Sequence, residues 1–338
     1  MNKSHKKREH SPDFPTAVWH GKDLFEGQPV DSLTVIFHTI GCHWSHKGGC
    51  TMCGYFNDSA TIPPTDENLL SQFDHVLKKM GTNTALIKIF TSGSFFDDRE
   101  IPSAVRTKIL ELIGDIGTIK KIVAETRPEF VTEKKLNDSK EILDKYGIQL
   151  EIAIGLETSN DTIRKDCINK GFTFNDFCEA SKTAKSLGVA TKAYLLLKPP
   201  FISEKTAIED IIASITDAAP YATTISINLC NIQKGTLVEE LSERKSYRPP
   251  WLWSAVYVLK KGKELFPEIT LMSDPVAAGL NRGPHNCKKC DGDVAQILRD
   301  FSISQDIGVL SEVDCDCYPL WEKVIELEDN TFGSYLIK

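Results

Sequence analysis

The stretch LTVIFHTIGCHWSHKGGCTMCGY, residues 33–55, decides the fold class. Its first eight residues are mostly apolar or β-branched and stop at Gly41, which is typical of a short buried strand. Cys42, Cys50 and Cys53 follow, so three thiols occupy the loop after that strand. We therefore expect a sheet whose first predicted strand ends at a cysteine-rich loop.

Strand-like and helix-like segments alternate along the chain after this loop. The first helix is predicted over residues 65–81, with Thr65 as its N-cap and Gly81 at its end. Five further strands are predicted, and each precedes helical sequence: residues 84–94 (which run into a Gly/Ser turn), 119–125, 149–157, 190–198 and 222–230. Six strand–helix units in succession predict a parallel α/β sheet.

A doubly wound sheet and a partial TIM-type (β/α)6 barrel both fit this alternation. A barrel gathers polar residues from the carboxyl ends of many strands at one mouth, whereas an open sheet concentrates them at one switch point. Polar residues stand just beyond nearly every predicted strand, and this favours the partial barrel: Cys42, Thr91–Ser94, Glu125, Arg127, Glu157, Lys198, Asn228 and Asn231.

The alternation stops after Met272, so we expect three regions. Residues 1–29 are an N-terminal arm and lead-in, residues 30–272 the partial barrel, and residues 273–338 a small cysteine-rich module. No apolar run approaches the roughly 18 residues of a membrane span, and the N-terminus lacks the apolar core of a signal peptide. We therefore expect a cytoplasmic protein with no membrane partner. The net charge of −7 argues against a broad nucleic-acid footprint of its own.

Seven of the ten cysteines fall into two tight clusters. In a chain without a secretory signal, this clustering favours metal binding over disulfide bonds. The front cluster, Cys42, Cys50 and Cys53, fits two sites. A structural zinc knuckle would take its fourth ligand from His38, His43 or His46. A [4Fe–4S] cluster would leave one iron free for a substrate or cofactor. The remaining three thiols, Cys167, Cys178 and Cys230, are expected to be buried small apolar side chains.

The tail cluster supplies a complete set of four ligands, in the order Cys287, Cys290, Cys315 and Cys317. Four thiolates suit tetrahedral zinc or an auxiliary iron–sulfur cluster, and zinc is the preferred interpretation.

The cysteine triad after the first strand, the aromatic Tyr55 beyond it and the Gly/Ser turn after the second strand together resemble the radical S-adenosylmethionine (SAM) enzymes. In that family three cysteines hold a [4Fe–4S] cluster whose free iron chelates SAM, and reductive cleavage yields a 5′-deoxyadenosyl radical. The usual spacing in the family is three residues and then two. This chain has a longer first interval, like the tRNA-modifying branch that includes Elp3-like enzymes and methylthiotransferases.

Several motifs in order resemble the radical subunits of archaeosine synthase, over nearly the whole chain after the arm. They are GGCTMCGYFNDS, FTSGSFFDDREIP, VAETRPEFV, ISINLCNIQKGTLVEE, YRPPWLW and RGPHNCKKCD. This resemblance implies a lyase that cleaves the C–N bond of a lysine adduct on the position-15 deazaguanine of tRNA, forming archaeosine. It also implies three partners: tRNA, a lysine-transferring subunit and an external electron donor.

The resemblance to radical SAM enzymes also implies SAM contacts. Ser92 and Gly93 stand where the family carries a Gly-Gly-Glu-like motif, although this chain lacks the glutamate, and an ordinary loop is the alternative. Glu125 and Arg127 could form a pair that holds the ribose or carboxylate of SAM, or a purely structural ion pair. The other candidate SAM contacts are Tyr55, Glu157, Asn228 and Gln233.

Two other functions remain open from the sequence. One is a different radical tRNA-modifying enzyme, either a methylthiotransferase or an Elp3-like acyl transferase. The other is a non-catalytic zinc-binding RNA module. A nucleophile with an adjacent base, a dinucleotide-binding fingerprint and a Walker sequence are not evident in the chain.

Overall fold

The computed structural model describes residues 11–328, so residues 1–10 of the predicted arm lie outside the described residues. The chain divides into two compact units, each of which is described separately. Among the described residues, the first unit contains 11–48, 55–154 and 175–191, and the second contains 49–54, 155–174 and 192–328. The predicted region boundaries at residues 29 and 272 stay predictions.

The sheet of the first unit begins with a hairpin and continues in parallel. Strand β1 (Ala17–Phe25) pairs antiparallel with β2 (Gln28–Ile36). Strands β3 (Thr84–Phe90), β4 (Lys121–Thr126) and β5 (Gln149–Glu157) then follow in parallel. Their inward side chains are aliphatic and fully buried, for example Leu33, Ile87 and Ile152 at 0% exposure. Apolar faces on both sides of the strands are what a helix-covered parallel sheet requires.

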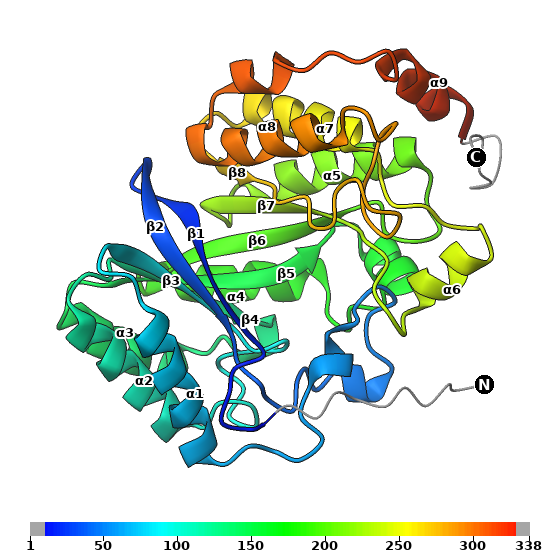
Figure 1. Ribbon diagram of the computed structural model, residues 1–338. Coiled ribbons are helices and arrows are strands. Elements are labelled where there is room, and N and C mark those ends of the chain that lie inside the picture. The colour runs from blue at the N-terminus through cyan, green and yellow to red at the C-terminus, as the bar shows by residue number, and fades with distance from the viewer. Residues whose placement is uncertain (1–10, 329–338) are drawn as a thin grey trace. The chain divides into compact units, whose positions relative to one another are not determined.

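Helices α1 (Asp66–Lys79), α2 (Ser103–Ile116) and α3 (Glu133–Asp144) lie next to one another along this sheet (Figure 1). Helix α4 (Phe174–Ser186) also belongs mainly to this unit. The predicted N-cap is confirmed. The Thr65 side chain accepts the Asn68 backbone N–H, and the Asn68 side chain accepts the Thr65 backbone N–H. Helix α1 buries Leu69, Phe73 and Val76 at helical spacing.

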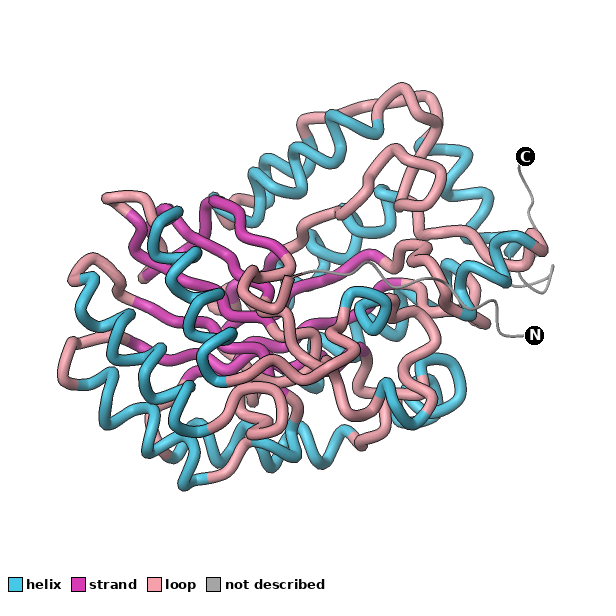
Figure 2. The backbone as a smooth tube through the Cα atoms, turned by 60° about the horizontal axis from the view of Figure 1, so that its bottom comes forward, coloured by secondary structure: helices cyan, strands magenta, loops and turns pink. Residues whose placement is uncertain are grey.

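The second unit has the same alternation. Strands β6 (Ala190–Leu197), β7 (Thr224–Leu229) and β8 (Thr270–Met272) pair in parallel. The helices of this unit are α5 (Glu204–Ala218), α6 (Leu237–Glu243), α7 (Leu252–Leu265), α8 (Asp291–Ser304) and α9 (Tyr318–Glu328). A π-helical turn, η4 (Ile163–Ile168), follows β5 and lies before α4. Figure 2 shows this succession of strands, helices and irregular loops along the backbone.

The strands are hydrogen-bonded in the order in which they occur along the chain, β1 to β8. In a doubly wound sheet the order of the strands reverses at a switch point. The sequential strand order seen here therefore confirms the barrel-type topology. All six predicted strand–helix units are present. Strands β1 and β8 were not predicted, and β8, which ends at Met272, adds with α8 a short seventh strand–helix unit.

Candidate cofactor-binding loops and metal centre

Cys42 lies in a loop of the first unit that begins directly after the Gly41 turn. Gly41 has a φ of 76°, a left-handed conformation that glycine adopts without strain. The Ser45 backbone N–H donates to the Cys42 carbonyl at 3.0 Å, and the loop then closes in a short 3₁₀ turn, η1 (Ser45–Lys47). Because the Cys42 thiol is half-buried, it remains accessible to a ligand.

Arg127 directs its guanidinium towards the Cys42 thiol. Its Nη1 lies 4.0 Å from the Cys42 Sγ, and its Nε donates to the Glu129 carboxylate at 2.6 Å. His43 Nε2 lies 3.4 Å from the same Glu129 carboxylate. Burial and the charge of Arg127 lower the pKa of His43 below its ordinary value, so this imidazole is neutral at physiological pH. A buried cation beside the Cys42 sulfur can offset the negative charge that this sulfur carries as a metal ligand.

Two glutamate carboxyl groups accept hydrogen bonds from the backbone of the predicted SAM-binding turn, residues 91–94. Ser92 is left-handed, with a φ of 67°. The Thr91 N–H donates to the Glu125 carboxyl group at 3.2 Å, so Glu125 fixes the first residue of this turn. The Ser94 N–H donates to Glu100 at 2.8 Å.

Glu100 is a site residue that sequence reasoning missed. It is 2% exposed, and its second carboxyl oxygen accepts from the Thr39 hydroxyl at 2.8 Å. Burial raises the pKa of Glu100 to about 8, so the group is protonated at neutral pH. Thr39 also receives the Gly41 backbone N–H at 3.0 Å. Glu100 therefore joins the turn at residues 91–94 to the loop that carries Cys42.

Cys50 and Cys53 lie in a segment of the second unit that is fixed through its backbone. The Cys53 N–H donates to the Cys50 carbonyl at 3.2 Å, which places the two cysteines in one turn. Thr51 donates its N–H to the Ile168 carbonyl at 2.9 Å and its hydroxyl to the Cys167 carbonyl at 2.7 Å. The turn is thereby held on η4.

Gln233 forms a hydrogen bond with Gly54, the residue that follows this turn. Its Oε1 accepts the Gly54 N–H at 2.6 Å, and a Cβ on Gly54 would come within 2.9 Å of the Gln233 Cβ. Of the other predicted SAM contacts, Glu157 is buried and pairs with Lys170 at 2.6 Å. Asn228 is half-buried on β7, and Tyr55, which belongs to the first unit, is 49% exposed.

The front triad thus divides between the units, with Cys42 in the first and Cys50 and Cys53 in the second. Its assignment to one cluster stays a prediction, as do the SAM contacts. Among the solitary thiols, Cys178 and Cys230 are buried as expected, and burial raises the pKa of Cys230 to about 12. Cys167 is only partly buried.

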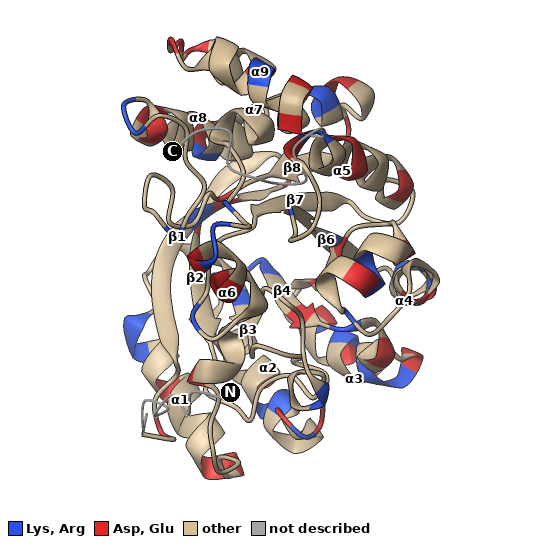
Figure 3. Ribbon diagram, turned by 90° about the vertical axis from the view of Figure 1, so that its right-hand side faces the viewer, with Lys and Arg blue, Asp and Glu red and all other residues tan. Residues whose placement is uncertain are grey.

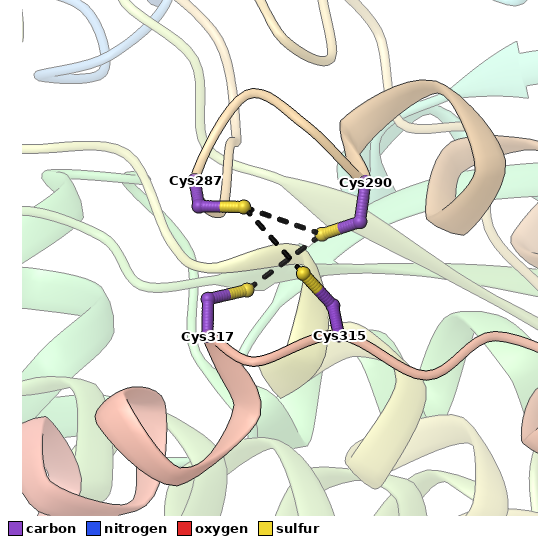
Figure 4. A group of neighbouring side chains, drawn as sticks. All are labelled: Cys287, Cys290, Cys315 and Cys317. Atoms are coloured by element: carbon purple, nitrogen blue, oxygen red, sulfur yellow. Dashed lines mark hydrogen bonds between the residues drawn. The ribbon is translucent and has the colours of Figure 1, made fainter.

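The four tail cysteines converge in the second unit, as Figure 4 shows. Their sulfur atoms all lie within 4.8 Å of one another. All four thiols are free, and the shortest sulfur–sulfur distances, 3.7 Å, are far beyond the roughly 2.05 Å of a disulfide. The predicted metal-binding cluster in the C-terminal region is therefore confirmed as an arrangement that could hold an ion.

Comparisons with known proteins agree on the family. Residues 36–211 match the Radical SAM superfamily. The archaeosine synthase subunit beta of Methanosarcina acetivorans is 52% identical, over 96% of this chain and 93% of its own length. The corresponding subunit of Thermococcus kodakarensis is 41% identical, over 91% of this chain and 96% of its own length.

A solved queuine lyase from Clostridium spiroforme, bound to SAM and queuine, covers 66% of this chain and 88% of its own, with a TM-score of 0.47 and 22% identity. At that level it carries no argument about function. Within residues 11–328, no helix combines the length and apolar character needed to cross a bilayer. The family match and the two near-full-length relatives establish that the chain belongs to the radical SAM superfamily, in the family of archaeosine synthase beta subunits.

Proposed function

We propose that this chain is the radical subunit of an archaeosine synthase. Its reaction would be cleavage of the C–N bond in a lysine adduct on the position-15 deazaguanine of tRNA, so that the amidine nitrogen remains on the base. The observation that carries the proposal is the 52% identity with the Methanosarcina acetivorans subunit over nearly the full length of both chains.

The donor set of the two cysteine loops fits the cofactors of the family. Cys42, Cys50 and Cys53 would hold the cluster, since all three residues are only partly buried. Arg127 at the Cys42 sulfur supports the charge of a thiolate-bound cluster. When bound, the cluster and SAM supply a carbon radical that can take a hydrogen atom from an unactivated C–H bond.

The chain's own residues would then bind and orient. The main chain of Ser92 and Gly93 is the best candidate for contact with the amino group of SAM, because hydrogen bonds to Glu125 and Glu100 fix the backbone on either side of these two residues. Gln233 fixes the backbone after Cys53. Such fixed positioning matters because a radical formed near a misplaced C–H bond reacts unproductively.

The charge pattern supports a division of labour in RNA binding. In Figure 3 the ribbon of helix α3 carries both the blue of Lys and Arg and the red of Asp and Glu. On this helix Lys134 pairs with Asp138 and Lys140 with Asp144, both at 2.6 Å. Paired charges of this kind offer little net attraction to phosphate, and the chain carries a net charge of −7. We infer that the lysine-transferring partner subunit holds most of the tRNA. The same proposal places the enzyme in the cytoplasm, where its tRNA and its electron donor occur.

The test uses anaerobically reconstituted protein, reductant, SAM and tRNA that carries the lysine adduct. We expect 5′-deoxyadenosine and archaeosine to form together, and their formation to speed up when the partner subunit is added. With tRNA that lacks the adduct, only slow uncoupled cleavage of SAM is expected. Mass spectrometry of the digested nucleosides gives the readout.

Each alternative function predicts a different product in this assay. A methylthio-modified base with an untouched adduct would assign the chain to the methylthiotransferases, and a carboxymethyl-type base would assign it to the Elp3-like enzymes. Absence of iron, of sulfide and of any SAM cleavage would favour the non-catalytic zinc-binding module. The Cys42/Cys50/Cys53→Ala triple variant is the matched control, because it should lose both products.

A further inference from the structure

The sulfur positions of the tail cluster fit a centre with one tetrahedral metal ion rather than a multinuclear cluster. Cys287 lies 3.9 Å from Cys290 and 3.7 Å from Cys315, and Cys290 lies 3.7 Å from Cys317 (sulfur to sulfur). Four ligands about 2.3 Å from a tetrahedral zinc ion lie about 3.8 Å from one another. A [4Fe–4S] cluster instead distributes its cysteines over four different irons, which spreads the sulfurs beyond the 4.8 Å that contains all four here.

We propose that these cysteines bind one zinc ion in a closed tetrathiolate site that holds helix α9 in place. Four protein ligands fill a tetrahedral ion, so no position stays open for SAM or for a sulfur atom awaiting transfer. An auxiliary cluster, which the sequence left open, does not fit these distances. This inference does not depend on the proposed reaction.

The protein around the sulfurs is built to support negative charge. The Trp253 indole N–H donates to the Cys317 sulfur at 3.2 Å, and the Asn286 amide donates to the Cys290 sulfur at 3.5 Å. The Asn286 side-chain oxygen accepts the Trp253 backbone N–H at 3.2 Å, so the two donors also fix each other. Hydrogen bonds of this kind orient the ligands and stabilise thiolates bound to a divalent ion.

The two ligand pairs precede two helices, and the ion therefore joins segments that are far apart in sequence. Cys290 is the N-cap of α8, and its carbonyl accepts the Val294 N–H at 2.9 Å. Cys317 immediately precedes α9, and its carbonyl accepts the Trp321 N–H at 3.0 Å. An ion bound by all four cysteines fixes the start of α9 against α8.

Helix α9 in turn completes a buried charge network. The Trp321 indole donates to the Ser254 hydroxyl at 2.8 Å, and that hydroxyl donates to Glu204 at 2.5 Å. At the other end of α9, Glu328 accepts the Glu204 backbone N–H at 2.6 Å. The Lys198 ammonium lies 2.9 Å from Glu204 and 3.3 Å from Glu328.

Loss of one member of this buried network would destabilise the fold. Lys198, Glu204 and Glu328 are 3%, 0% and 6% exposed. Burial alone would raise the pKa of Glu204, but Lys198 and Arg248 together lower it below its ordinary value, so the carboxylate is ionised. Removing one partner of such a buried set leaves an uncompensated charge. Release of α9 would withdraw Glu328 from Lys198 and from the first N–H of α5.

Metal analysis of the anaerobically purified Cys42/Cys50/Cys53→Ala variant tests the identity of the ion. We expect one zinc per chain, with iron and sulfide near zero. Retention of iron and sulfide would overturn the proposal in favour of a second cluster, and absence of any metal would overturn the site itself. With the front triad intact, Cys315→Ser should lose zinc and keep the front iron, while Cys167→Ser should keep both.

Cobalt substitution provides a measurement that needs no variant. The full-length chain with the tail ion replaced by Co²⁺ should show the visible ligand-field bands of a tetrahedral tetrathiolate. Spectra of octahedral cobalt, or no cobalt uptake, would contradict the closed four-sulfur site.

Hydrogen exchange at the Glu204 amide tests the connection to α9. Zinc removal by a chelator and Glu328→Ala, which removes the acceptor, should each speed exchange of this amide at least tenfold. Glu326→Ala on the exposed side of the same helix is the control and should leave the rate unchanged, because Glu326 pairs with Lys323 at the surface. If zinc removal leaves the Glu204 amide as protected as before, the ion does not hold α9.

Discussion

Gly93 packs directly against the backbone of Cys42. A Cβ atom on Gly93 would come within 2.8 Å of the Cys42 Cα, closer than real side chains approach, and it would also collide with the Glu100 carboxyl group. The glycine is therefore required by the contact between the turn at residues 91–94 and the loop that carries Cys42. A predicted SAM-binding residue and a predicted cluster ligand thus share one backbone contact.

Gly93→Ala should displace this contact and lower both iron content and SAM cleavage. We expect at least a tenfold loss of cleavage, which corresponds to about 1.4 kcal/mol in the barrier. The measurements are iron and sulfide per chain and the rate of 5′-deoxyadenosine formation. Gly292→Ala is the matched control, because a Cβ there meets nothing within 4 Å. Wild-type values for both variants would show that the contact can relax without consequence.

Glu100 should make stability depend on pH in an unusual direction. The folded chain keeps this proton up to about pH 8, whereas the unfolded chain releases it near the ordinary value of 4.5. Because the folded state binds more protons between these values, this group's contribution to the free energy of unfolding falls as pH rises through that window. The total change is of the order of a few kcal/mol.

Glu100→Gln keeps the acceptor for the Ser94 N–H but cannot ionise. The variant should therefore lose most of the decline in stability between pH 5 and pH 8, as measured by denaturant unfolding at several pH values. The control is Glu141→Gln, at an exposed position on α3, which should follow the wild-type profile. An unchanged slope in Glu100→Gln would assign the decline to other groups.

The parts of the fold that sequence could predict are those with strong apolar periodicity. The six strand–helix units and the Thr65 cap carry local signals, and the family assignment confirms the predicted enzyme class with its [4Fe–4S] cluster and SAM. Strand β1 was missed because four of its nine residues are exposed and only Asp23 is buried, so the strand shows no alternation of apolar and polar side chains. The signal available was Glu26–Gly27, both left-handed, which form a two-residue hairpin turn.

The site was less predictable because its partners are distant in sequence. Strand β8 has three residues, too few to show a period. Glu100 reaches Thr39 across 61 positions, and Gln233 reaches Gly54 across 179, so no local pattern could pair them. Arg127 was predicted, but its ion pair with Glu129 and its approach to Cys42 emerge only from the folded chain.

Gln233 should stabilise the turn that carries Cys50 and Cys53. Gln233→Ala removes the acceptor of the Gly54 N–H, and an amide that loses its partner costs about 1–3 kcal/mol when it stays buried. We expect faster loss of the cluster on exposure to oxygen or chelator, followed by absorbance. Gln233→Glu, which keeps an acceptor oxygen, should restore most of the lifetime. Equal lifetimes for the alanine variant and wild type would remove Gln233 from the site.

Arg127 should set the redox properties of the cluster rather than the stability of the fold. Its guanidinium lies 4.0 Å from the Cys42 sulfur and Arg127 as a whole is 5% exposed, so its charge acts on that ligand with little screening by solvent. Loss of a positive charge beside a thiolate ligand disfavours the added electron, so Arg127→Gln should make the reduction potential more negative. SAM cleavage should slow by about tenfold. Redox titration followed by electron paramagnetic resonance measures the first effect, and 5′-deoxyadenosine formation the second. Arg127→Lys keeps the charge, and its reduction potential should lie between those of the wild type and Arg127→Gln.

The control is Arg299→Gln, which removes an exposed arginine paired with Asp274 and should leave the potential at the wild-type value. If Arg127→Gln lowers the unfolding midpoint but leaves the potential unchanged, Arg127 supports the fold and does not tune the cluster.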